Sequence, residues 1–152
     1  MPELDLSKVL LSMDKAYASG DDSWFDYLDE NIVVYSQNKA EPFEDKKSYM
    51  EYFKDALTSS TRDLIIISRQ IRSLGEISVV SQTVRINQDD VIVNVKQTQV
   101  WGITDGEWKL NHFHSTFAGT PRATDSLEAS AESINVINEK IATMAAVVGV
   151  AQ

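Results

Sequence analysis

The stretch that decides the fold is residues 63–117, which read DLIIISRQIRSLGEISVVSQTVRINQDDVIVNVKQTQVWGITDGEWKLNHFHSTF. It is rich in Val, Ile, Thr and Trp, the β-branched and aromatic residues that favour strands. Polar turn sequences divide it, and Asp105-Gly106 between two apolar runs is a strong hairpin signal. The pattern therefore predicts an antiparallel meander of four long strands, at residues 63–74, 77–87, 91–102 and 107–117.

The residues before this stretch predict three helices and one strand. Apolar residues recur at spacings of three and four between residues 6 and 17, which is the period of one helical face, and Gly20 suits a left-handed helix stop. Asp21-Asp22 can cap a second, short helix. A strand at residues 32–35 and a third helix at residues 45–57 follow. Helices beside an antiparallel sheet indicate an α+β fold.

The residues after the meander predict a last helix. Pro121 breaks the chain, and Asp125 with Glu128 three residues later is a capping-box arrangement. Residues 121–152 are expected to belong to the same domain and to pack on the sheet of their own subunit or of a partner, whereas a coiled coil is the weaker alternative. The apolar stripe of this helix consists of Leu127, Ile134, Ile137, Ile141, Met144 and Val148.

Composition excludes several classes of protein. The chain has 152 residues, a typical length for one domain. Its formal net charge of −9 argues against nucleic acid as a partner, because phosphate binding needs cationic side chains. With no Cys and two His, the chain has no disulfide, no thiolate metal site and no all-histidine zinc site, and we expect no metal and no cofactor.

Nothing in the sequence predicts a membrane protein. The longest unbroken apolar stretch, from Met144 to Val148, is far shorter than the ~20 residues of a membrane span. The first residues lack the basic and apolar regions of a signal peptide. We therefore expect no membrane partner and a cytoplasmic location.

Three short sequences, taken in order, resemble a known family. Residues 17–21 (YASGD) resemble the end of its first helix, and residues 28–35 (LDENIVVY) its entry into the first strand. Residues 108–115 (WKLNHFHS) are similar to its closing strand. Over residues 5–120 the chain resembles the nuclear transport factor two-like superfamily, in particular its SnoaL-like group. It is also similar to the association domain of calcium/calmodulin-dependent kinase II.

The resemblance implies a cone-shaped fold over residues 1–120, in which three N-terminal helices pack against a strongly curved, mainly antiparallel sheet. It implies an apolar cavity that takes a small hydrophobic molecule, and a homodimer formed through the outer face of the sheet. Members include ketosteroid isomerases, dehydratases, polyketide cyclases, epoxide hydrolases and pocket domains that only assemble or bind. The fold therefore leaves the function open.

The resemblance also argues against steroid isomerisation. That chemistry needs a carboxylate base and an oxyanion hole, often a Tyr and a protonated Asp. The matching positions hold Tyr35 for the base, a residue near Met13 for the Tyr, and a residue near Thr98 for the Asp. None of these side chains supplies the group that the reaction requires.

His112 and His114 are the candidate acid and base. They alternate along a predicted strand, so both project from one face. If that face is the inner one, either His can act as a general acid or base, with Tyr35 as a hydrogen-bond donor. If it is the outer one, both are interface or surface residues. The pattern does not decide between the two, because a single bulge would move both His to the opposite face.

Further candidates would bind the ligand. Arg69 and Arg85 lie in predicted strands, where an inward guanidinium would clamp a carboxylate and an outward one would extend to solvent or to a dimer partner. Gln97 and Gln99 share a strand face with Val91, Val93, Val95 and Trp101, and would orient a ligand or bond across an interface. Aromatic side chains would line the cavity or form ordinary core. The aromatic candidates for ligand binding are Tyr17, Trp24, Tyr49, Phe53 and Trp101.

Two functions follow from these residues. The first is a SnoaL-like small-molecule pocket protein, whose chemistry would be proton transfer (cyclisation, dehydration or isomerisation) on a hydrophobic ligand with or without a carboxylate. The second is a non-catalytic ligand-binding or association module. An inward His114 beside Tyr35 would favour the first, and a sealed core with both His on an interface would favour the second.

Overall fold

The computed structural model describes residues 2–36, 39–119 and 122–123. The predicted C-terminal helix, which follows Asp125, lies outside these residues. Of the 121–152 extension, Arg122 and Ala123 are described and form a short strand. The elements in chain order are α1 (Pro2–Ser19), η1 (Asp22–Tyr27), β1 (Leu28–Tyr35), α2 (Lys46–Thr58), β2 (Asp63–Leu74), β3 (Ile77–Gln88), β4 (Val91–Thr104), β5 (Glu107–Phe117) and β6 (Arg122–Ala123).

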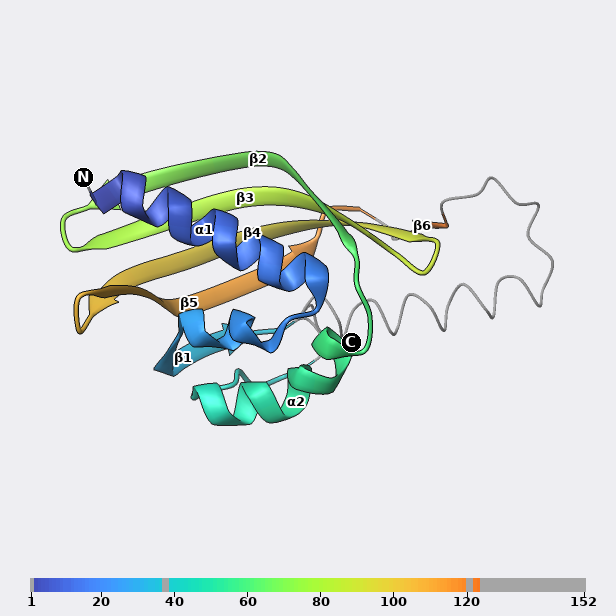
Figure 1. Cartoon of the computed structure of the whole chain (residues 1–152), viewed down its shortest axis with the longest axis horizontal. Helices are drawn as coiled ribbons and strands as arrows, with labels where there is room; N and C mark the ends of the chain where they lie inside the picture. Colours follow the sequence, from blue (N-terminus) through green and yellow to red (C-terminus); the bar gives the residue numbers. More distant parts are fainter. Residues whose placement is uncertain (1, 37–38, 120–121, 124–152) are drawn as a thin grey trace.

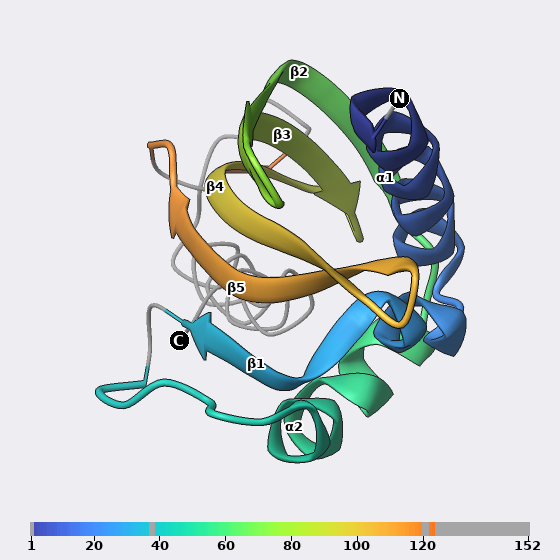
Figure 2. The same ribbon diagram turned by 90° about the vertical axis from the view of Figure 1, so that its left-hand side faces the viewer.

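The strands form one sheet in the order β1-β5-β4-β3-β2, and β6 pairs with β4. Strands β2 to β5 are an antiparallel meander, and β1 runs parallel to β5. The sheet curls, and α1 lies across its hollow side (Figures 1 and 2). This confirms the predicted α+β fold with a curved, mainly antiparallel sheet.

Two details differ from the prediction. The second helix, η1, is a 3-10 helix, with Asp21 accepting a hydrogen bond from the Ser23 backbone N–H at 2.9 Å. Strand β1 begins at Leu28, ahead of the predicted start at Ile32. Leu28 is buried whereas the polar residues after it are not, and this mixed stretch lacks the run of β-branched residues that predicts a strand.

The sheet has an inner face, which the helices cover, and an outer face on the opposite side. Side chains alternate between the two, as in β3, where every second residue from Ser78 to Gln88 is buried. The inner side holds one apolar core. At its centre the rings of Trp24, Phe25 and Phe53 lie with their centroids 5.3–6.1 Å apart.

Irregular registers in two strands change which residues face inward. In β2 the register shifts between Ile66 and Ser68. In β5, Leu110 pairs with Trp101 and His112 pairs with Val100, so Asn111 is the extra residue of a bulge. One extra residue reverses the alternation of all residues that follow it.

Arg62 joins the ends of both α-helices to the sheet. Its side chain is 5% exposed, and its guanidinium donates to the carbonyl oxygens of Tyr17, Leu57 and Ser60. Its Nε donates to Gln88 Oε1 on β3 at 3.0 Å. These carbonyls lie at helix C-termini, where orphan acceptors and the helix dipole favour a cation. Burial lowers the pKa of Arg62 from its usual value.

Gly20 permits the close approach of the two helix ends. Its φ is +69°, and a Cβ there would lie 2.5 Å from the Ser60 carbonyl oxygen and 2.9 Å from that of Leu57. Any larger residue would separate the acceptors that Arg62 binds.

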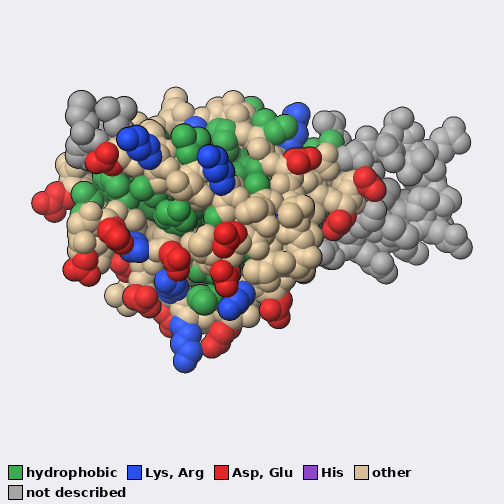
Figure 3. Space-filling view, viewed as in Figure 1, with side chains coloured by type: hydrophobic (Ala, Val, Ile, Leu, Met, Phe, Trp, Pro, Cys, Tyr) green, Lys and Arg blue, Asp and Glu red, His purple; other side chains and the backbone are tan. Residues whose placement is uncertain are grey.

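Charges of both signs are interspersed over α2 and η1 on the face shown in Figure 3. Lys46 lies 3.8 Å from Glu30, and Lys54 lies 3.8 Å from Asp22. No helix in the described ranges is long and apolar enough to cross a membrane.

We expect Arg62→Leu to lower the free energy of unfolding by about 3 kcal/mol, because three buried carbonyl groups lose a charged donor. Arg62→Lys should recover only part of the loss, since an ammonium lacks the planar fork. The measurement is urea unfolding, with Arg72→Leu on exposed β2 as the matched control. Equal unfolding midpoints for Arg62→Leu and Arg72→Leu would contradict this role.

Candidate functional site

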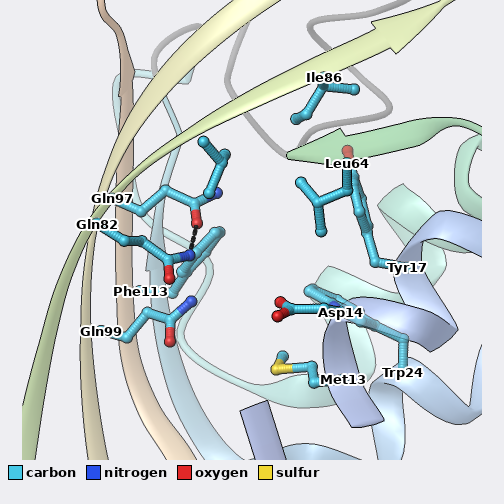
Figure 4. A pocket seen from close by; sticks show the side chains of 11 residues that line it. Met13, Asp14, Tyr17, Trp24, Leu64, Gln82, Ile86, Gln97, Gln99 and Phe113 are labelled. Carbon is cyan, nitrogen blue, oxygen red and sulfur yellow. Dashed lines mark hydrogen bonds between the residues drawn. The ribbon is translucent and has the colours of Figure 1, made fainter. Parts of the chain in front are cut away.

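A cavity of about 40 Å³ lies between α1 and the inner face of the sheet. Figure 4 shows its two walls, with glutamines of the sheet on one side and residues of α1 and η1 on the other. The lining residues are Met13, Asp14, Tyr17, Trp24, Leu64, Gln82, Val84, Ile86, Gln97, Gln99 and Phe113.

This cavity is much smaller than the ligand-sized one expected from the sequence. Small-molecule sites typically enclose about 300–1,000 Å³. Here buried side chains, among them Trp24 and Phe113, line the cavity and leave about 40 Å³. A molecule larger than a few waters therefore needs side chains to move, and Met13, with its unbranched thioether chain, is the most adaptable of the lining.

A row of polar side chains crosses the inner face at the cavity. Arg69 pairs with Gln82, Gln82 with Gln97, and Gln97 with Ser115, on four successive strands. Ser36 extends the row, because it follows Tyr35, the partner of His114. We call Arg69, Gln82, Gln97, Ser115 and Ser36 the polar row. A neighbouring row is wholly apolar and consists of Ile66, Val84, Val95 and Phe117.

One end of the polar row is a bidentate ion pair. Arg69 Nη1 and Nη2 each lie 3.0 Å from a carboxylate oxygen of Asp14 on α1. Arg69 Nε donates to Gln82 Oε1 at 2.8 Å, and Gln82 Nε2 donates to Gln97 Oε1 at 2.5 Å. The chain of bonds thus runs from the helix across three strands.

The other end of the polar row contains two hydroxyl groups without partners. Ser36 is 8% exposed and Ser115 is 1% exposed. Within the described part of the chain, neither Oγ has a hydrogen-bond partner. Such groups are uncommon in folded proteins, because each loses its bonds to water.

Tyr17 supplies a neutral phenol to the cavity wall. Burial raises its pKa well above the usual value, and the positive charge of Arg62 only partly opposes the shift. The Arg62 guanidinium carbon lies 4.8 Å from the centre of the Tyr17 ring. Tyr17 therefore stays protonated at neutral pH and can donate a proton in a hydrogen bond but not act as a base.

The structure brings several of the predicted ligand-binding residues together. Tyr17, Trp24 and Gln97 line the cavity. Arg69 faces inward because the register shift in β2 reverses its alternation, and it contacts the site through Asp14 and Gln82. Trp101 is fully buried and is not part of the cavity lining, but its indole N–H donates to Gln99, which is.

The other predicted ligand-binding residues lie elsewhere. Tyr49 and Phe53 pack together in the core, 5.5 Å between ring centroids, and are not part of the cavity lining. Arg85 points to the outer face, between the inward Val84 and Ile86, and donates from Nε to Asn94 at 3.0 Å. No extra residue in β3 reverses its alternation, so Arg85 does not reach the cone.

Tyr35, His112 and His114 do meet, but on the outer face. The Tyr35 ring centroid lies 5.6 Å from that of His112 and 5.9 Å from that of His114. The bulge at Asn111 turns both imidazoles away from the helices, while Phe113 between them faces inward. This is the outcome that predicts an interface or surface role for the two His.

Sequence reasoning missed Asp14 and Gln82, although each had a signal. Asp14 follows Leu10 by four residues and precedes Tyr17 by three, so it lies within the apolar helical stripe. Gln82 shares its alternation with the buried Val80 and Val84. A polar residue at an apolar position of the pattern was the available sign in both cases. Among the described residues, no group of three or more His, Cys, Asp or Glu is placed to hold a metal ion.

The fold and the position of this cavity define a cone domain of the nuclear transport factor two-like type. Residues 7–119 match the model of the SnoaL-like domain, and the chain belongs to that family. No curated protein matches it.

Solved structures share this fold. An NTF2-like protein of unknown function from Pseudomonas putida KT2440 is 14% identical with a TM-score of 0.68, covering 84% of this chain and 96% of that one. A ketosteroid-isomerase-like protein of Parabacteroides distasonis is 19% identical with a TM-score of 0.64, covering 72% and 85%. The CaMKII hub of S. rosetta is 22% identical with a TM-score of 0.60, covering 75% and 95%. At these identities the likeness shows the fold alone.

We expect Asp14 and Arg69 to be energetically coupled. Their side chains are only 22% and 14% exposed, so removing one partner leaves a poorly solvated charge. A double-mutant cycle with Asp14→Asn and Arg69→Met should give a coupling free energy of about 1 kcal/mol or more. The control pair is Lys46 and Glu30, where the Glu30 side chain is 83% exposed. Equal coupling in the two pairs would show that the Asp14–Arg69 pair is no better than a surface pair.

Proposed function

We propose that this SnoaL-like domain binds a small organic molecule with hydrogen-bonding groups inside its cone. The observation that carries the proposal is the polar row, which crosses the inner face beside an apolar row and ends in the unpartnered hydroxyls of Ser36 and Ser115. A buried polar group without a partner costs about 1–3 kcal/mol. A ligand that hydrogen-bonds to these hydroxyls would recover that cost, whereas a domain that only needed a core would avoid it with apolar residues at the same positions.

The proposed activity is binding without proton transfer by histidine. His112 and His114 lie on the outer face, across the sheet from the cavity. The carboxylate in the cavity lining, Asp14, has each of its oxygens 3.0 Å from an Arg69 guanidinium nitrogen, so both oxygens are already engaged within the protein. The inner residues thus favour recognition over acid–base chemistry.

The test is a fragment screen by saturation-transfer NMR, using uncharged polar fragments of up to about ten heavy atoms. We expect weak binders to wild type, and at least a tenfold loss of affinity in Met13→Phe, which fills the cavity from α1. Leu11→Phe is the matched control, because Leu11 lies on the same helix with 58% of its surface exposed.

Two results would contradict the proposal. One is an absence of binding at millimolar fragment concentrations. The other is binding that Met13→Phe leaves unchanged, which would place the fragments outside the cone. Circular dichroism of both variants separates loss of binding from loss of fold.

A second candidate function is assembly through the outer face of the sheet. The described helices cover only the inner face, and the outer face presents Tyr35 (45% exposed) and Ile77 (46% exposed) together with the half-buried Val79 and Val100. Apolar side chains on a sheet face that no described helix covers favour a protein partner. We propose a homodimer on this face, and the cytoplasm as its location.

Sedimentation at micromolar concentration should give about twice the chain mass of 17.0 kDa. Val100→Lys, in the middle of the outer face between Val79 and His112, should give a monomer because it buries a charge at the interface. Leu11→Lys on the exposed side of α1 should remain dimeric. A monomeric wild type would overturn this second candidate and leave the first untouched.

A further inference from the structure

We propose that the cone recognises its ligand by an uncharged carbonyl group, which accepts hydrogen bonds from the side-chain amides of Gln97 and Gln99. The inference rests on the proposed function and names the chemistry of its ligand. It follows from the direction of the hydrogen bonds around the cavity.

The first constraint on direction is Trp101. An indole N–H can only donate, and Trp101 Nε1 donates to Gln99 Oε1 at 2.9 Å. Trp101 is fully buried, so its indole has no access to water as an alternative acceptor. The carbonyl oxygen of Gln99 is therefore held against Trp101, and its amide nitrogen is turned the other way.

The second constraint is Arg69. A guanidinium can only donate, and Arg69 Nε donates to Gln82 Oε1 at 2.8 Å. The Gln82 amide is thereby oriented so that its nitrogen donates to Gln97 Oε1 at 2.5 Å (Figure 4). Arg69 therefore fixes the orientation of the Gln82 amide, and the Gln82 nitrogen in turn uses the carbonyl oxygen of Gln97 as its acceptor.

Both glutamines thus offer amide N–H groups to the cavity. Each lines it, they lie on the same face of β4, and Gln99 is 5% exposed. Among the described residues, neither amide nitrogen donates a hydrogen bond. Figure 4 shows the Gln99 nitrogen directed across the cavity toward the Asp14 side. Amide donors that line a cavity and are unused within the described protein favour an acceptor on the ligand.

The remaining lining narrows the kind of acceptor. The Asp14 carboxylate is paired with the Arg69 guanidinium, so the lining offers no unpaired charge to hold an anion or a cation. Each glutamine carbonyl oxygen already accepts one hydrogen bond, whereas among the described residues neither amide nitrogen donates one, so the two glutamines favour an acceptor. A carbonyl oxygen accepts two hydrogen bonds and brings no hydrogen that needs a partner. Its hydrocarbon part would lie against Met13, Trp24 and Phe113.

The experiment compares cyclohexanone, labelled with ¹³C at its carbonyl carbon, with cyclohexylammonium. Both have a six-membered ring, but one can only accept and the other can only donate hydrogen bonds. Protein-observed NMR should give at least tenfold tighter binding for the ketone. The ¹³C signal of the bound ketone should move downfield, as hydrogen bonding to its oxygen requires.

Three variants test the residues. Gln99→Leu should weaken ketone binding at least tenfold and reduce the downfield shift. Trp101→Phe keeps a buried ring but removes the donor that orients Gln99, so the preference for ketone should fall at least threefold. Gln70→Leu, on the exposed part of β2, is the matched control and should behave as wild type. Met13→Phe reports whether the probe enters the cone.

The outcomes separate this inference from the proposed function. Tighter binding of cyclohexylammonium, or a ketone shift unchanged in Gln99→Leu, would overturn the carbonyl assignment while binding in the cone stands. If neither probe binds and the fragment screen also finds nothing that Met13→Phe excludes, both are overturned. If other fragments bind in the cone but the ketone does not, only the carbonyl assignment fails.

Discussion

Every hydrogen-bonding group that the cone removes from water must find a partner inside it, and this constraint organises the molecule. Arg62 meets it fully: one guanidinium binds the carbonyl groups at the ends of two helices and a glutamine of the sheet. The polar row meets it only in part, because its bonds run from Asp14 to Gln97 and then stop. The Arg62 contacts stabilise the fold, whereas the polar row, within the described residues, leaves hydrogen-bonding groups free for a ligand.

The contrast explains how a well-packed domain retains a functional interior. Arg62 lies where helix ends, a turn and β3 converge, so its donors are used within the chain. The donors of Gln97 and Gln99 point instead into a space bounded by α1. The adjacent row shows that apolar residues can fill this part of the inner face, so the glutamines are not required by packing alone. Their presence is the physical reason to favour ligand binding over simple assembly.

Most of the fold could be predicted from the sequence, because its elements are long and regular. The alternation and turn residues of β2 to β5 identify the meander, and Gly20 marks the end of α1. It was harder to predict from the sequence which face of the sheet each side chain occupies. A bulge needs no distinctive residue, and the one at Asn111 decides that His112 and His114 face outward. A strict alternation drawn along β2 would likewise group Arg69 with Ile65, although a shifted register separates them.

The site was predictable only in part for a related reason. Aromatic residues such as Tyr17 and Trp24 stand out in the sequence, and both line the cavity. The polar row is assembled from five separate segments, and its register depends on pairings between residues far apart in the chain. Tyr49 looks equally suited to a ligand in the sequence, yet it packs in the core. Membership of the SnoaL-like family places the cone but not the chemistry inside it.

Neutron diffraction of the perdeuterated protein would test the direction of the interior hydrogen bonds most directly. Deuterium positions distinguish an amide nitrogen from a carbonyl oxygen without inference from neighbours. We expect the amide deuterons of Gln97 and Gln99 to face the cavity, with the Gln99 oxygen toward the Trp101 indole. A carbonyl oxygen of either glutamine facing the cavity would contradict the donor-lined interior on which the recognition argument rests.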